Sequence, residues 1–147
     1  GREPEDGPDA FADIAARDVV AEIWATVDLD RALRELGAPG ERLADDPLLG
    51  AAIRLVRREG GPTIALAEPI TEGRLAASLA RFGEGSAGRY VVARDGLVGA
   101  ARELARRGVR LSRPAEGPFG LSVLVLGGPV AGPHLVLVDP AAGTIDR

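Results

Sequence analysis

Three side chains on one face of a predicted strand could carry chemistry. Residues 19–27 alternate along an extended segment, so that Glu22, Trp24 and Thr26 point to the same side. A carboxylate, a large aromatic ring and a hydroxyl on one face are typical of a sheet surface that lines a ligand pocket. The opposite side suits packing under a helix, and it carries Ala21, Ile23, Ala25 and Val27.

A further candidate is His134, the only histidine in the chain. It begins a short apolar strand, and nothing in the sequence places it near a hydroxyl nucleophile, so a Ser–His–Asp triad is not predicted. The absence of cysteine excludes disulfides, thiolate nucleophiles and zinc–thiolate sites. The Gly-Gly-Pro segments at 60–62 and 127–129 lie between predicted strands and not before a helix, which argues against a phosphate-binding loop.

The chain has 147 residues, a net charge of -4, and contents of 46% hydrophobic and 27% charged residues. These values indicate a soluble globular protein, built as one domain or as two small fused repeats. The mild negative charge argues against a nucleic-acid partner, and no apolar run reaches the ~18 residues of a membrane span. The acidic start lacks the hydrophobic segment of a signal peptide, so we expect a cytoplasmic protein. The first residue is not Met, which fits a processed chain or a domain cut from a longer polypeptide.

The elements that position these residues follow from caps and periodicity. Residues 1–18 predict a flexible leader with a short helix. After the strand at 19–27, Asp28 is a good cap for a helix over 29–36, which Gly37 ends. The rest of this half is predicted as a polar stretch that can hold a short edge strand, two paired strands and an amphipathic helix, at 40–46, 51–58, 63–68 and 71–82.

The same pattern then starts again. Residues 83–88 have the composition of a flexible connector, and a strand at 89–93 follows it. Asp95 opens a helix from about 97 to 107, and Gly108 ends it. The chain closes with a short strand, a loop and two buried strands, at 109–112, 114–118, 121–126 and 134–138.

The two halves therefore share one order of elements. Matching residues, such as Asp28 and Asp95 or Pro69 and Pro140, lie about seventy positions apart, as a duplicated unit requires. Each half reads βαβββ and cannot cover its own sheet. We expect an α+β fold in which tandem βαβββ repeats form one curved mixed sheet with helices on the convex face. The domain spans 19–147, with repeats at 19–69 and 89–140 and a linker helix within 70–88.

A tandem βαβββ chain of this length resembles the vicinal oxygen chelate superfamily. This superfamily includes glyoxalase I, methylmalonyl-CoA epimerase, extradiol dioxygenases and bleomycin-resistance proteins. The resemblance covers residues 19–140, and the order and spacing of its motifs imply the fold. The motifs are 27–32 (Val-Asp-Leu-Asp-Arg-Ala), like V-x-D-L-x-x-A; 64–69 (Ile-Ala-Leu-Ala-Glu-Pro), like I-x-L-L-E-P; 107–109 (Arg-Gly-Val); 118–120 (Pro-Phe-Gly); and 132–140, which ends in Asp-Pro as the family's closing motif does.

The metal site of the superfamily is not matched. Catalytic members hold a divalent metal with a His on the first strand, a His on the strand that opens the second half, and a Glu on the last strand. In this chain the first position falls on Ala21 or Glu22, the second on Arg89 or Tyr90, and the third near Val136. Valine cannot ligate a cation, and hard divalent ions need several converging oxygen or imidazole ligands. We therefore expect neither a metal nor another cofactor.

The resemblance implies a concave face, or cup, that would collect the candidate site residues. The expected ligand-binding residues are Trp24, Thr26, Arg54 or its neighbours, either Arg89 or Tyr90, and Ser122, and the expected catalytic residues are Glu22 and His134. Alternation within each strand is clear, but the sequence leaves open which side faces inward. Each residue also has a structural alternative: Trp24 in a core, Glu22 and Arg54 on a solvated face, His134 in a surface turn, and Tyr90 as an anchor of the sheet.

Two functions fit these features. The first is a metal-free protein that binds a mid-sized organic ligand in the cup, in a natural-product or antibiotic self-resistance setting. The second is an epimerase, isomerase or lyase, in which Glu22 or His134 moves a proton next to a carbonyl and an Arg stabilises the oxyanion. A third possibility is one domain of a larger synthase. The partner is in each case a small molecule, and the chain could be a monomer or a homodimer.

Overall fold

The computed structural model describes residues 18–126 and 134–139. The predicted leader helix and the predicted turn at 127–133 lie outside these residues. None of the three described helices is both long and apolar enough to cross a membrane.

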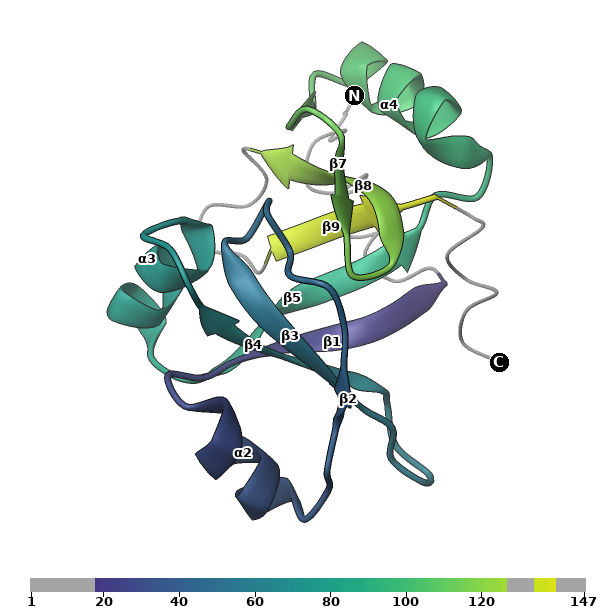
Figure 1. Cartoon of the computed structure of the whole chain (residues 1–147). Coiled ribbons are helices and arrows are strands. Elements are labelled where there is room, and N and C mark those ends of the chain that lie inside the picture. Colours follow the sequence, from purple (N-terminus) through teal and green to yellow (C-terminus); the bar gives the residue numbers. More distant parts are fainter. Residues whose placement is uncertain (1–17, 127–133, 140–147) are drawn as a thin grey trace, which may run out of the picture.

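Within the described residues, nine strands form one curved mixed sheet (Figure 1). The strands are β1 (Val19–Ala25), β2 (Glu41–Arg42), β3 (Ala51–Val56), β4 (Ile64–Pro69), β5 (Gly85–Val92), β6 (Arg110–Leu111), β7 (Ala115–Gly117), β8 (Gly120–Leu126) and β9 (His134–Val138). Their order across the sheet is β2-β3-β4-β1-β5-β9-β8-β6, and β7 pairs with β8. The strands of each half therefore lie side by side, as a duplicated βαβββ unit requires.

The two halves meet at β1 and β5, which pair antiparallel. On its other side, each of these strands pairs in parallel with the last strand of its own half, β1 with β4 and β5 with β9. This arrangement confirms the predicted fold class. It also places the two strands that open the repeats at the centre of the sheet, where side chains from both halves can meet.

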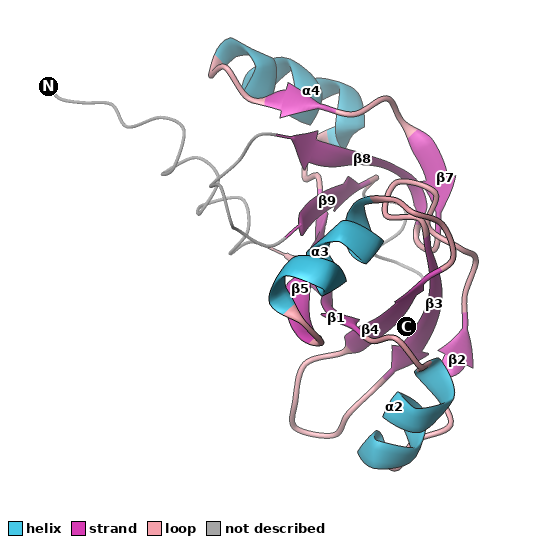
Figure 2. Ribbon diagram, turned by 90° about the vertical axis from the view of Figure 1, so that its left-hand side faces the viewer, coloured by secondary structure: helices cyan, strands magenta, loops and turns pink. Residues whose placement is uncertain are grey.

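Helices cover the sheet on both sides. The described helices are α2 (Leu29–Leu36), α3 (Arg74–Phe82) and α4 (Gly96–Arg106). On the outer face, α2 packs Leu29 and Leu33 on β3 and β4, and α4 packs Leu97 and Leu104 on β5, β8 and β9. Figure 2 shows these two helices at opposite ends of the curved sheet, with α3 between them.

The inner, concave face is filled by a core cluster to which both halves contribute. Its strand residues include Ala21, Ile23, Ala25, Ile53, Leu55, Ala65, Ala67, Tyr90, Leu124, Val136 and Val138. α3 buries Leu75 and packs Leu79 against the same cluster. The centre of the inner face is therefore a packed interior.

The two repeat helices begin differently. Asp28 accepts a hydrogen bond from the backbone N of Arg31 at 3.1 Å and so caps α2, as predicted, whereas Asp95 at the start of α4 makes no such side-chain bond. α3 begins at Arg74, later than the predicted 71, because Gly73 precedes it in an extended conformation (φ -112°, ψ -151°).

The predicted connector at 83–88 is mostly strand. β5 starts at Gly85, and its first residues pair with the end of β1. At Gly88 the φ is +149°, and an added Cβ would lie 1.9 Å from the carbonyl oxygen of His134 on the neighbouring strand. Glycine at this position therefore allows two strands to approach closely. A prediction from composition alone interprets the same glycine as a sign of flexibility.

Both edges of the sheet are short. β2 and β6, the outermost strands of the order, contain two residues each. Three of these four side chains carry a charge, namely Glu41, Arg42 and Arg110, and all three are exposed.

Candidate functional site

One row of side chains crosses the centre of the inner face. Ala21 on β1 is paired with Tyr90 on β5, which is in turn paired with Val136 on β9. All three are buried, with exposures of 1% or less. Each of them is one of the positions at which the resemblance places a metal ligand, with Glu22 and Arg89 as the alternatives for the first two, and within this row only Tyr90 has a side-chain oxygen.

The residues of this row do not fit a divalent metal. Such an ion needs several converging oxygen or imidazole ligands, and the row offers one phenol between a methyl and an isopropyl group. No group of three or more His, Cys, Asp or Glu side chains within the described part of the chain is arranged to hold a metal ion. The three-ligand centre of the superfamily therefore has no counterpart among these residues.

The polar centre of the inner face is a buried pair, Tyr90 and Asp46. The Tyr90 hydroxyl donates to Oδ2 of Asp46 at 2.6 Å, and neither residue is exposed. Burial, together with the negative charge of Asp46, raises the pKa of Tyr90 well above its ordinary value of 10.0. The phenol therefore stays protonated and acts as a donor. The ring of Phe119 packs edge-on against Tyr90, with centroids 4.8 Å apart.

Asp46 is also the organising residue of the turn before β3. Its Oδ1 accepts hydrogen bonds from the backbone N of Leu48 at 2.8 Å and of Leu49 at 3.2 Å. Three donors thus satisfy a carboxylate that is completely buried. Sequence reasoning missed Asp46, although the Asp-Pro-x-x-Gly pattern of residues 46–50 is a turn signal in which the Asp side chain bonds to the following backbone.

His134 lies on the inner face at the start of β9. It has the same strand parity as Val136 and Val138, both of which belong to the inner cluster. The side chain is half-buried, and its Nε2 has no hydrogen-bond partner among the residues that the structure describes. Burial lowers the pKa of His134 below 6.5, the positive charge of Arg74 lowers it further, and Asp46 partly opposes both effects. The imidazole is therefore neutral near pH 7.

Ser122 is the third predicted site residue on the inner face. It is buried on β8 next to Val138, and its Oγ donates to the carbonyl oxygen of Ala115 at 3.3 Å. The hydroxyl is thus used within the β7–β8 pair. Tyr90, Ser122 and His134 are the predicted residues that the structure brings to one face.

The other predicted site residues lie on the outer face. On β1 the inward positions belong to Ala21, Ile23 and Ala25, so Glu22, Trp24 and Thr26 point away from the cup. Arg54 has the parity opposite to Ile53 and Leu55 and therefore also points outward. The cup implied by the resemblance, with Glu22, Trp24 and Thr26 inside it, is wrong on this point. The small side chains of β1 face inward, where the strands and α3 pack closely.

Each outward residue has a structural environment of its own. Glu22 pairs with Arg89 on the neighbouring strand, at 3.1 Å between Oε1 and Nε. Trp24 is 43% exposed. Glu22 and His134 thus lie on opposite faces of the sheet and cannot act on the same bound molecule.

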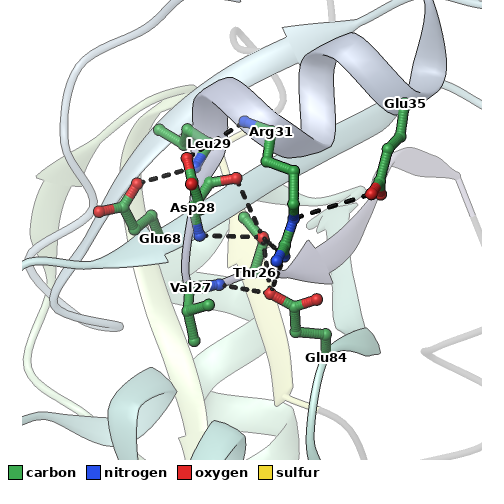
Figure 3. A network of polar contacts seen from close by, with 8 residues as sticks. All are labelled: Thr26, Val27, Asp28, Leu29, Arg31, Glu35, Glu68 and Glu84. Carbon is green, nitrogen blue, oxygen red and sulfur yellow. Dashed lines mark hydrogen bonds and ion pairs between the residues drawn. The ribbon is translucent and has the colours of Figure 1, made fainter.

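Thr26 belongs to a network of polar contacts at the start of α2 (Figure 3). Its Oγ1 donates to Glu84 at 3.0 Å, and the same carboxylate oxygen accepts from the backbone N of Val27 at 2.8 Å and pairs with Arg31. The Val27 and Arg31 contacts lower the pKa of Glu84, as does the bond from Thr26. The network ties the β1–α2 turn to the segment before β5, which is a structural task.

A cavity of about 380 Å³ lies elsewhere, on the outer face between β5 and α4. Its walls include Val91, Ala93, Leu104 and Leu137, with Arg94 and Glu103 among the charged residues. It contains none of the predicted site residues.

Solved structures share this architecture. The methylmalonyl-CoA epimerase of Mycobacterium tuberculosis aligns over 90% of this chain and 96% of its own, with 22% identity and a TM-score of 0.66. The Streptomyces coelicolor methylmalonyl-CoA epimerase, in complex with 2-nitronate-propionyl-CoA, aligns over 85% and 98%, with 23% identity and a TM-score of 0.67. A hypothetical protein of Bacillus halodurans aligns over 84% and 94%, with 18% identity and a TM-score of 0.66.

No protein-family model matches the sequence, and no curated protein does. At these identities the structural likeness establishes the fold and not the activity. The chain has the vicinal oxygen chelate fold, as the sequence motifs implied.

Proposed function

We propose that this chain uses the vicinal oxygen chelate fold to bind a small organic molecule at the His134 end of the inner face, and that it does so without a bound metal. The observation that carries the proposal is the row Ala21, Tyr90 and Val136. The resemblance puts metal ligands at or next to these positions, and the row offers a packed interior in their place.

The location follows from a polar atom on the inner face that has no partner among the described residues. Tyr90, Val136 and Val138 are buried, so a mid-sized ligand cannot occupy the centre of the cup. His134 is half-buried on the same face, and its Nε2 makes no hydrogen bond to any described residue. A ligand polar atom at this point would satisfy a buried nitrogen that is otherwise costly to leave unpaired.

The metal part of the proposal is tested by thermal unfolding with Mg²⁺, Mn²⁺, Co²⁺, Ni²⁺ or Zn²⁺ and with a chelator. We expect the midpoint to stay the same in every case, because a metal that binds only the folded state would raise it. A saturable rise with one ion, together with one-to-one binding in calorimetry, would contradict the proposal.

The binding part is tested by nuclear magnetic resonance of the imidazole, because His134 is the only histidine. A compound that binds at this site shifts the signals of His134 in a saturable way. Trp24 is a poor reporter of this site, since it lies on the opposite face of the sheet. A separate experiment tests the natural-product or self-resistance setting. If a toxic compound binds at this site, cells that express the chain should tolerate that compound better than cells that express a His134→Ala variant.

A second candidate function is metal-independent proton transfer by His134. Two observations favour it: the shared fold with methylmalonyl-CoA epimerases, and a neutral imidazole whose Nε2 has no hydrogen-bond partner among the described residues. The test is exchange of the α-proton of methylmalonyl-CoA in deuterated water. Exchange that is lost in His134→Gln and kept in Glu22→Gln supports this function, whereas no exchange by the unchanged protein excludes it for this substrate.

A further inference from the structure

We propose that the ligand of this site is a small organic carboxylate, whose negative charge lies between the guanidinium of Arg74 and Nε2 of His134. This inference rests on the proposed binding function and adds the chemical class of the ligand. It also assigns a role to Arg74, a residue that sequence reasoning did not single out.

Arg74 is an arginine without an anionic partner in the part of the chain that the structure describes. It is the first residue of α3, and its side chain makes no hydrogen bond or ion pair there. Several other arginines do engage a carboxylate, as Arg31 does with Glu84, Arg94 with Asp18 and Arg107 with Glu103. The residue is exposed, so a guanidinium that has no partner among the described residues can pair with the carboxylate of a ligand that arrives from solvent.

A chain of hydrogen bonds fixes the start of α3 against the polar centre. The backbone N of Leu75 donates to the carbonyl oxygen of Leu49 at 3.1 Å, and the backbone N of Leu49 donates to Asp46 at 3.2 Å. The other oxygen of Asp46 accepts from Tyr90. The beginning of α3, where Arg74 stands, is therefore held in place relative to the central row.

His134 lies at the same end of that row. On β9 it is the next inward position before Val136, which is the direct partner of Tyr90. Figure 1 and Figure 2 both place α3 beside the end of β9 that begins with His134. Arg74 is close enough for its charge to act on the imidazole, as is Asp46. Arg74 and Asp46 are the described ionisable groups whose charges act on His134.

The charges of this cluster favour an anion. Asp46 is completely buried and already accepts three hydrogen bonds, so its carboxylate does not also form an ion pair with Arg74. A ligand carboxylate would pair with Arg74 and accept a hydrogen bond from His134. It would also favour the imidazolium form, because an opposite charge nearby stabilises the charged state. Binding of the carboxylate and protonation of His134 therefore support each other, and binding tightens as the pH falls.

The test compares isobutyrate with isobutyramide, two probes of equal shape that differ in charge. Binding is measured through the imidazole signals of His134 in the whole chain. We expect isobutyrate to bind at least about tenfold more tightly than isobutyramide, which corresponds to one charge-assisted contact. We also expect its dissociation constant to fall from about pH 8 to about pH 6, and that of the amide to stay constant.

Arg74→Gln should remove the preference for isobutyrate and leave the binding of isobutyramide unchanged. Arg81→Gln is the matched control, because it removes the same charge from the other end of α3. Equal binding of the two probes, or a preference that survives Arg74→Gln, would overturn the carboxylate inference and leave the proposed binding function standing. If neither probe nor any other small molecule shifts the His134 signals, the proposed function itself is wrong, and the inference falls with it.

Discussion

At the level of single residues, His134 is the group whose protonation the fold opposes. It would gain a charge in a half-buried position that already lies near Arg74. The neutral form is therefore the one that the folded state favours. The unfolded chain has no such restriction, so the two states differ in how readily they take up a proton.

We expect the free energy of unfolding to decrease as the pH falls from about 8 to about 5. The unfolded chain protonates His134 near the ordinary pKa of 6.5 and the folded chain only at a lower pH, so the unfolded state binds more protons in this window. The contribution is fully present above 6.5 and is lost as the pH falls below it. Urea unfolding at several pH values measures the effect.

His134→Gln is the control for this pH dependence, because it keeps a polar side chain that does not titrate. The variant should show a flatter profile between about pH 7 and about pH 5 than the unchanged chain. Identical profiles would assign the loss of stability to carboxylates instead.

The sequence predicted which residues share a strand face, but not which face points inward. Tyr90, Ser122 and His134 were predicted and share the inner face, but Glu22, Trp24, Thr26 and Arg54 lie outside it. Alternation defines two faces of a strand without saying which one is covered. In β1 the closely packed side is the one with Ala21 and Ala25, and that choice depends on the neighbouring strands. Arg74 had no signal in the sequence, because its neighbours come from other elements.

At the level of elements, the repeat predicts two equivalent helices that are capped differently. Asp28 bonds to the backbone of α2, whereas Asp95 makes no side-chain bond to α4. A capping bond satisfies one of the free backbone donors at a helix start, so its removal exposes that donor without a partner.

We expect Asp28→Ala to lower the free energy of unfolding by about 1 kcal/mol. Asp95→Ala, the matched substitution in the second repeat, should cost less than about 0.5 kcal/mol, as an exposed side chain without such a contact does. Chemical denaturation of both variants gives the comparison. Equal losses would mean that the capping bond of Asp28 contributes nothing specific.

Most elements were predictable because caps and periodicity are local. Asp28 and Gly37 marked α2, and the apolar runs marked β3, β4, β8 and β9. The strand at the end of the 83–88 segment was not predicted, since Gly88 serves the approach of β5 to β9 and not a flexible connection. A glycine that accommodates a neighbouring strand looks the same in a sequence as one that allows a turn.

At the level of the whole molecule, contacts between the halves are polar as well as apolar. Asp46 of the first half bonds to Tyr90 of the second, and Glu84 holds the β1–α2 turn. The inner core cluster also draws side chains from both halves. If one half unfolds, the core residues of the other half are exposed to water.

We therefore expect one cooperative unfolding transition. Trp24 and His134 occur once each and report on β1 and β9, so they allow each half to be followed separately. The urea midpoints from Trp24 fluorescence and from His134 resonances should coincide, as they do for a two-state domain. Two separate midpoints would show that the halves are independent.

The abbreviated strands at the two margins of the sheet also affect behaviour in concentrated solution. A long open sheet invites a foreign chain to extend its ladder, and fibrils grow in this way. Here β2 and β6 contribute only two residues of backbone each, and β7, which also borders β8, only three, beside the charges of Glu41, Arg42 and Arg110. An incoming strand would find little to template on and would have to desolvate charged groups. The sheet can thus stay open, because its short, charged edge strands disfavour the addition of further strands.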